Sequence, residues 1–185
     1  MRKIILLTVI VAAFILNGCG GSSSQPNFKD LVSFFISPIS LKLTKEQFAQ
    51  ESAAIYARVF QEVGNLLNKH SKIDASFEKE IDKLYDSSAK QMIEYGKVLA
   101  KKDEETRQDY IMTSAIASWD ALDKLDPKVT ANTEKQLDER QHEFETYASE
   151  NLERKFDDLF SIMDFLNFET LKEQRPLSAK EFGIE

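Results

Sequence analysis

Apolar residues recur at intervals of three and four along most of this chain, and this spacing constrains its fold more than any other feature. The spacing places apolar side chains on one face of an α-helix, whereas no segment shows the alternation of a β-strand. Glycine and proline, which interrupt helices, number only six and four. We therefore predict an all-α fold, and the short connections between apolar stripes favour an up-down bundle of three to four long helices.

The first two long helices are predicted between Thr44 and Leu99. Thr44 begins a capping box, in which a threonine hydroxyl and a glutamine three residues later satisfy the first backbone N–H groups, and its helix ends near His70. Asp74 or Ser76 can cap the next helix. Its apolar stripe extends from residue 77 to residue 99.

The boundary between the second and third stripes is ambiguous. Residues 101–109 contain no apolar side chain. The chain either turns near Asp103, a good N-cap residue, or continues through this polar stretch, so that residues 77–125 form two helices or one. The third stripe ends before Pro127, and we expect it to face the core. Its residues are Ile111, Ala115, Ile116, Trp119, Leu122 and Leu125.

The last stripe predicts a helix that starts between residues 130 and 133 and extends to about residue 166. A helix of that length would span about 60 Å at 1.5 Å per residue. It therefore either breaks, near residues 149–151, or packs as a hairpin against a continuous 77–125 helix. Phe165, Phe168 and Phe182 form either an exposed patch for a partner or a C-terminal segment that covers the bundle.

A short amphipathic helix is predicted before the bundle and ends before Pro38, because the residue preceding a proline disfavours helical geometry. Such a segment either lies in a membrane interface or covers one end of the bundle. We favour the second alternative, in which it covers the bundle. Phe34 lies off its apolar face. That face consists of Phe28, Leu31, Val32, Phe35 and Ile36.

The first residues have the composition of a signal peptide. Arg2 and Lys3 precede an apolar run over residues 4–16, which is shorter than the about 20 residues that a membrane-spanning helix needs. The following Leu16-Asn17-Gly18-Cys19 resembles the lipobox of bacterial lipoproteins, although Asn17 is bulkier than the small residue usual there. The resemblance implies cleavage before Cys19 and attachment of acyl chains, such as palmitate, to this residue.

The resemblance also implies a division of the chain and a location. Residues 1–18 would be the signal peptide, residues 19–27 a flexible Gly/Ser tether, and residues 28–185 the helical domain. Gly20 stands where an aspartate tends to retain such proteins in the inner membrane. We therefore expect a lipid anchor in the outer membrane, with the domain in the periplasm.

Composition excludes several classes of function. The formal net charge of −7 disfavours binding to nucleic acid or to anionic lipid headgroups. Cys19 is the only cysteine, which excludes an intramolecular disulfide and a cysteine-based zinc site. We therefore expect no cofactor.

Neither histidine indicates catalysis or metal binding. Glu139 and His142 have the E-x-x-H spacing of di-iron bundles, but Leu67 stands three residues before His70, so the second such pair is missing. We expect His70 to stabilise a helix C-terminus and expect no catalytic or metal-binding residue.

These observations favour a membrane-anchored protein without enzymatic activity that binds another envelope protein. The alternative hypothesis is a carrier or sensor that holds a lipid or small apolar molecule between its helices. The sequence leaves the partner and the oligomeric state open.

Overall fold

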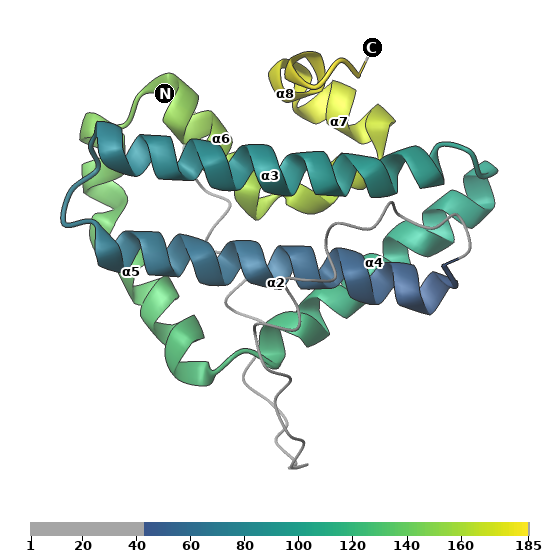
Figure 1. Ribbon diagram of the computed structural model, residues 1–185, viewed down its shortest axis with the longest axis horizontal. Helices are drawn as coiled ribbons and strands as arrows, with labels where there is room; N and C mark the ends of the chain where they lie inside the picture. The colour runs from purple at the N-terminus through teal and green to yellow at the C-terminus, as the bar shows by residue number, and fades with distance from the viewer. Residues whose placement is uncertain (1–42, 185) are drawn as a thin grey trace. The chain divides into compact units, whose positions relative to one another are not determined.

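The computed structural model describes residues 43–184, and these residues form helices and short connections without a β-strand (Figure 1). The predicted signal peptide, tether, lipidation residue Cys19 and N-terminal amphipathic helix lie outside the described residues. The helices are α2 (Lys45–Lys69), α3 (Ala75–Leu99), α4 (Glu104–Asp123), α5 (Pro127–Tyr147), α6 (Glu150–Phe160), the 3-10 helix η3 (Ile162–Leu166), α7 (Phe168–Gln174) and α8 (Pro176–Glu181).

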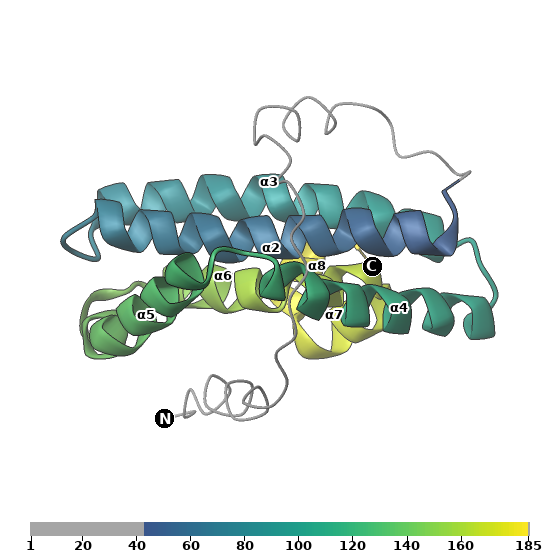
Figure 2. The same cartoon turned by 90° about the horizontal axis from the view of Figure 1, so that it is seen from below.

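In the described chain, α4 and α5 lie along α2, and α6 lies along α3. Helices α2 and α3 form an antiparallel hairpin, and the later helices form a second layer against it (Figures 1 and 2). Along α2, Asp109 of α4 contacts Lys45, and Arg140 of α5 bonds the Leu67 carbonyl. Helix α6 then returns along α3, where Lys155 contacts Asp82. The predicted all-α bundle is confirmed, and it contains four helices of 20 to 25 residues. Its chain direction alternates over α2, α3, the pair α4 and α5, and α6, because α4 and α5 together make one pass along α2.

The helix starts follow from side chains that bond the first backbone N–H groups. The capping box predicted at Thr44 is present, because Thr44 accepts from the Gln47 N–H and Gln47 accepts from the Thr44 N–H. Asp74, rather than Ser76, caps α3. Asp103 caps α4, and the turn before it separates α3 from α4. The alternative of one helix over residues 77–125 is therefore wrong.

The predicted start of α5 at residues 130–133 is also wrong. Helix α5 begins at Pro127, and Asp126 accepts from the Lys128 N–H. Proline suits the first position of a helix, because its missing N–H would have no intrahelical partner there. The break predicted near residues 149–151 is confirmed, since α5 ends at Tyr147 and Ser149 caps α6.

The C-terminal segment covers the bundle, as one of the two predicted alternatives requires. Phe165 is fully buried, and its ring lies 6.2 Å from the Tyr85 ring of α3 and 6.1 Å from the Phe182 ring. Pro176 occupies the first turn of α8, so it begins a helix as well as ending one. None of the described helices is long and apolar enough to cross a membrane.

Aromatic rings meeting edge to face connect the helices in the core. Phe48 of α2 lies 5.1 Å from the Tyr95 ring of α3 and 5.3 Å from the Tyr110 ring of α4. Phe77 and Phe144 join α3 to α5 at a centroid distance of 5.8 Å. Such pairs contribute about 1 kcal/mol each beyond the burial of their area. The apolar stripe predicted over residues 77–99 therefore contributes closely packed side chains to this core, Phe77 and Tyr95 among them.

Candidate functional site

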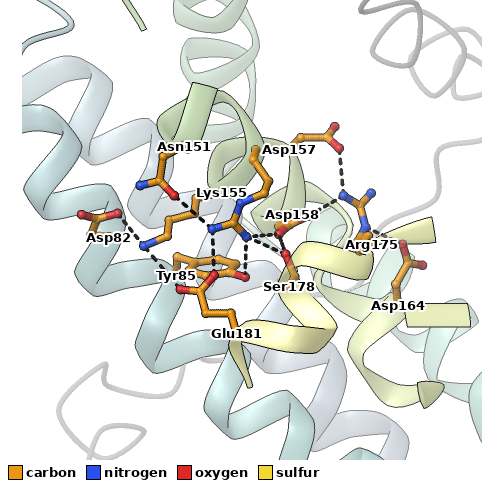
Figure 3. Close-up of polar contacts among 11 residues, drawn as sticks. Asp82, Tyr85, Asn151, Lys155, Asp157, Asp158, Asp164, Arg175, Ser178 and Glu181 are labelled. Carbon is orange, nitrogen blue, oxygen red and sulfur yellow. Dashed lines mark hydrogen bonds and ion pairs between the residues drawn. The ribbon is translucent and has the colours of Figure 1, made fainter. Parts of the chain in front are cut away.

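A network of charged and hydroxyl side chains joins α3, α6 and the C-terminal helices, and we call it the Asp158 cluster (Figure 3). Helices α3, α6, η3 and α8 and the turn between α7 and α8 supply its members. They are Asp82, Tyr85, Arg154, Lys155, Asp157, Asp158, Asp164, Arg175, Ser178 and Glu181.

Asp158 lies at the centre of the cluster and is only 1% exposed. Its Oδ1 accepts from the Arg175 Nη1 at 2.6 Å, and its Oδ2 accepts from the Ser178 hydroxyl. The Arg154 Nη1 contacts the same Oδ2 at 3.3 Å. A buried carboxylate is costly unless it is paired and hydrogen-bonded, and here two guanidinium groups and a hydroxyl meet that requirement.

Arg175 connects α6 to the turn between α7 and α8. Its Nη1 lies 2.8 Å from Asp157, and its Nε lies 3.0 Å from Asp164. Burial by itself would lower the pKa of Arg175, but hydrogen bonds to three carboxylates outweigh it and raise the pKa above the ordinary value. Arg175 therefore remains a permanent positive charge that holds three acidic residues together.

Tyr85 and Lys155 extend the cluster toward α3. The Lys155 Nζ bonds Asp82 at 2.9 Å and lies 5.2 Å from the centre of the Tyr85 ring. Burial raises the pKa of the Tyr85 hydroxyl well above its ordinary value, so this group stays protonated. Arg154 donates to that hydroxyl at 3.2 Å.

The geometry of the cluster suits a structural connection better than catalysis. Ser178 is 1% exposed, donates to Asp158 and accepts from the Arg154 Nη1 at 2.6 Å. Its hydroxyl oxygen is thus enclosed by protein groups rather than presented to a substrate, and no histidine belongs to the cluster to take its proton. We conclude that the cluster fastens α8 to α3 and α6.

The residues weighed earlier for metal binding are not brought together. Glu139 and His142 are both exposed on α5. Within residues 43–184, no group of three or more histidine, cysteine or acidic side chains could hold a metal ion.

His70 ends α2 as its C-cap, as expected, and its side chain is 12% exposed. Its backbone carbonyl accepts from the Arg140 Nη1 at 2.8 Å, and its ring lies edge-on to the Phe77 ring. The Nε2 atom is 3.5 Å from a Glu80 carboxylate oxygen. His70 therefore connects the end of α2 to α3 and α5.

The third apolar stripe does not face the core as predicted. Met112, Ile116 and Trp119 lie one turn apart on the outer side of α4, and their exposed fractions are 63%, 60% and 47%. We call these three residues the α4 ridge. The side of α4 that is buried carries small residues instead, Ser114 and Ser118.

The sequence holds a signal for this ridge that the stripe interpretation missed. Apolar residues occur as adjacent pairs, Ile111 with Met112 and Ala115 with Ile116, so they cover two faces of the helix. A helix that packs on one side cannot bury both faces. Acidic residues border the exposed face, with Asp109 before it and Asp120 and Asp123 after it.

Two hollows on the surface are open to solvent. One, of about 240 Å³, lies at the C-terminal helices beside Lys172 and Lys180, and the other, of about 280 Å³, lies on the outer side of α2 and α3 beside Lys69 and Glu80. Both are lined largely by charged or small side chains. Neither extends between the aromatic side chains of the core.

Comparison of the chain with protein-family models, with curated proteins and with solved structures gives no match.

Proposed function

We propose that this protein is a lipid-anchored module of the cell envelope, without enzymatic activity, that binds another envelope protein. The observation that carries the proposal is the α4 ridge. Three large apolar side chains, Met112, Ile116 and Trp119, are exposed in a row on one helix.

Exposed tryptophan and methionine side chains are typical of the centres of protein interfaces. Tryptophan is among the residues whose loss most weakens binding, and charged residues are depleted at interface cores but common at their rims. The α4 ridge has this composition, because Asp109, Asp120 and Asp123 border its three apolar residues. A single helix face of this kind fits the groove or helix of another protein.

The proposed anchor would place the α4 ridge near other membrane proteins. Two or three acyl chains on Cys19, at about 0.8 kcal/mol per buried methylene, would hold the protein permanently at a membrane. The Gly/Ser tether would let the domain reach roughly 15 Å from the bilayer. The lipobox resemblance favours the periplasmic side of the outer membrane.

The carrier hypothesis receives no comparable support. A lipid or other apolar ligand needs an apolar cavity between the helices. Phe48, Phe77, Tyr85 and Phe165 are each fully buried in edge-to-face contacts there.

The proposal is tested by photo-crosslinking in cells. A photoreactive amino acid replaces Ile116 in the α4 ridge, and in a matched control it replaces Glu139, which is exposed on α5. Each variant is made with Cys19 intact and with Cys19→Ser. We expect one discrete adduct with an envelope protein from position 116, only with Cys19 intact, and none from position 139.

Two results would count against the proposal. Equal adducts from positions 116 and 139 would show that the α4 ridge is not a specific surface. An adduct that forms equally with Cys19→Ser would show that the anchor does not matter for the interaction.

A further inference from the structure

Four lysines of α3 lie on one line along the solvent-facing side of the helix, and we call them the α3 lysine row. Each residue of an α-helix is turned by about 100° from the one before it, so residues 79, 83, 90 and 97 fall within about 20° of a common line. The row extends over about 27 Å at 1.5 Å per residue. Its members are Lys79, Lys83, Lys90 and Lys97, and all four are exposed.

The acidic residues of α3 are less exposed than its lysines. Only one of the five, Glu94, is exposed, and the other four are partly buried. Three of the five point to the sides of the helix and bond a residue of another element. These contacts are Glu78 with Ser149 at 2.6 Å, Glu80 with Lys69 at 2.7 Å and Asp82 with Lys155 at 2.9 Å.

Two carboxylates lie beside the row and neutralise part of its charge. Asp86 is 3.9 Å from the Lys90 Nζ, and Glu94 is 2.6 Å from the Lys97 Nζ. Exposed ion pairs of this kind are weak, so they do not prevent the lysines from meeting another anion. Because four lysines stand beside two carboxylates, the outer side of α3 keeps a positive net charge.

The acidity of the described chain is concentrated in the other layer of the bundle. Helices α4 and α5 together contain ten acidic residues and four basic ones, whereas α3 contains five and four. Figure 2 shows α4 and α5 in the layer that packs against the inner side of the α2–α3 hairpin. Packed helix axes lie about 8–10 Å apart, and the Debye length at physiological ionic strength is about 8 Å. The second layer is therefore largely screened from whatever meets the outer side of α3.

A membrane with anionic headgroups is the partner that fits this surface. An extended helix side can bring all four lysines to one plane, and each lysine near an anionic membrane favours the bound orientation by about fivefold. An acidic protein would need a matching line of carboxylates about 27 Å long. A bilayer offers negative charge at every position, so it needs no such match.

We propose that the α3 lysine row is the side that the domain turns toward a membrane containing anionic lipids. The proposal rests on the proposed function for one point, the attachment of the chain to that membrane. Attachment gives an effective concentration in the millimolar range, so the attraction of a few lysines is sufficient to orient the domain. Helices α4 and α5 then face away from the lipid, on the side that a protein partner can reach.

Quenching of a fluorescent dye on vesicles tests this orientation in the full chain. A hexahistidine tag at the N-terminus holds the chain on nickel-chelating lipid, and Cys19→Ser leaves one introduced thiol to carry the dye. The dye is placed at Ser87→Cys, exposed on α3 beside the row, or in a matched control at Glu139→Cys, exposed on α5. The quencher is attached to lipid headgroups, in vesicles of phosphatidylcholine with or without phosphatidylglycerol.

We expect the anionic vesicles to quench the dye at position 87 several-fold more strongly than the dye at position 139. Vesicles of phosphatidylcholine alone should quench both equally. In 1 M salt, where the Debye length falls to about 3 Å, the difference between the two positions should disappear.

Charge reversal within the row should abolish the orientation. Lys83→Glu combined with Lys90→Glu should remove the difference between positions 87 and 139. Lys128→Glu combined with Lys135→Glu changes the net charge equally but lies on α5, so this matched control should keep the difference. Urea denaturation checks that both variants are folded. Lys83→Gln combined with Lys90→Gln gives a milder change and should reduce the difference by a smaller amount.

Three results would overturn the proposal. Equal quenching of positions 87 and 139 by the anionic vesicles would show that the domain has no preferred orientation. Equal effects of the two charge reversals would show that net charge, and not the α3 lysine row, determines the attraction. A discrete protein adduct in cells from a photoreactive amino acid at position 87 would assign the row to a protein partner.

The two proposals fail separately, because nickel-chelating lipid takes the place of acyl chains on Cys19. If the vesicles orient the domain but position 116 gives no adduct in cells, the α3 lysine row stands and the proposed function is wrong. If the adduct at position 116 forms but the vesicles quench positions 87 and 139 equally, the proposed function stands and the orientation is wrong.

Discussion

Gly64 of α2 lies directly against Thr133 of α5, so closely that a β-carbon at Gly64 would be 2.0 Å from the Thr133 Oγ1. Replacing glycine by alanine within a helix ordinarily stabilises it by up to about 1 kcal/mol. Here the added methyl group must push the two helices apart. We expect Gly64→Ala to lower the free energy of unfolding by about 1–3 kcal/mol, measured by urea denaturation.

A second substitution tests whether Thr133 is the cause. Thr133→Ala removes the Oγ1 at 2.0 Å and the Cγ2 at 3.2 Å from the new methyl group, although the Thr133 Cβ would still lie 3.0 Å away. Gly64→Ala should therefore lower the free energy of unfolding less in the Thr133→Ala background than in the wild-type background. Equal losses in both backgrounds would contradict this account.

Gly96 makes the corresponding contact on α3 but cannot be rescued in the same way. A β-carbon there would lie 2.5 Å from the Phe168 Cε1 and 2.7 Å from the Phe165 carbonyl oxygen. Truncating Phe168 leaves the backbone oxygen in place. We expect Gly96→Ala to destabilise the protein in thermal denaturation, and Phe168→Ala to give little rescue in the double variant.

The periodic apolar spacing predicted the helices because burial of one face drives each of them. The stripe over residues 77–99 became α3, with Phe77 and Leu99 fully buried. Capping residues predicted several ends, since Thr44 and Asp103 make their hydrogen bonds locally. These predictions required only neighbours in the sequence.

The predictions that failed required knowledge of distant contacts. Asp126-Pro127 can end one helix or begin the next, so the local sequence does not decide where α5 starts. In the structure α5 starts at Pro127, and its Thr133 lies against Gly64 of α2. Trp119 matched a core stripe, but α4 packs through Ser114 and Ser118 and turns Trp119 outward. The Asp158 cluster joins residues more than 70 positions apart, and no local pattern indicated it.

The Asp158 cluster should contribute strongly to stability. Asp158→Ala leaves Arg175 and Arg154 partly buried with fewer carboxylates, and breaking a buried ion pair in this way typically costs about 3–5 kcal/mol. We expect a loss of that order in urea denaturation. Glu94→Ala breaks the exposed pair with Lys97 and should change stability by no more than about 0.5 kcal/mol.

Loosening of α8 would distinguish this role from a general loss of stability. Limited proteolysis of Asp158→Ala under native conditions should cleave first near the turn between α7 and α8, which Arg175 holds. Cleavage spread evenly over the chain, or no faster than in Glu94→Ala, would contradict the fastening role of the cluster.

Glu143 should make stability depend on acidic pH. Burial by itself would raise the pKa of Glu143, but hydrogen bonds from Arg140 at 2.8 Å and from the Ile73 N–H at 2.7 Å outweigh it and lower the pKa below 4.5. Because the folded state has the lower pKa, this stabilisation is present above the unfolded-state value and is lost as the pH falls through the folded-state value.

Glu143→Gln removes the titrating group while keeping one oxygen for the Ile73 N–H. The variant should be less stable than wild type at pH 7, and the difference should shrink as the pH is lowered from about 4.5 toward 3. Urea denaturation across this range measures it, with Glu145→Gln as the control because Glu145 is exposed on the same helix. If the difference in free energy of unfolding between wild type and Glu143→Gln stays constant from pH 7 to pH 3, the prediction is wrong. The negative charge of Glu143 would then not contribute to the connection between α5 and the end of the α2–α3 turn.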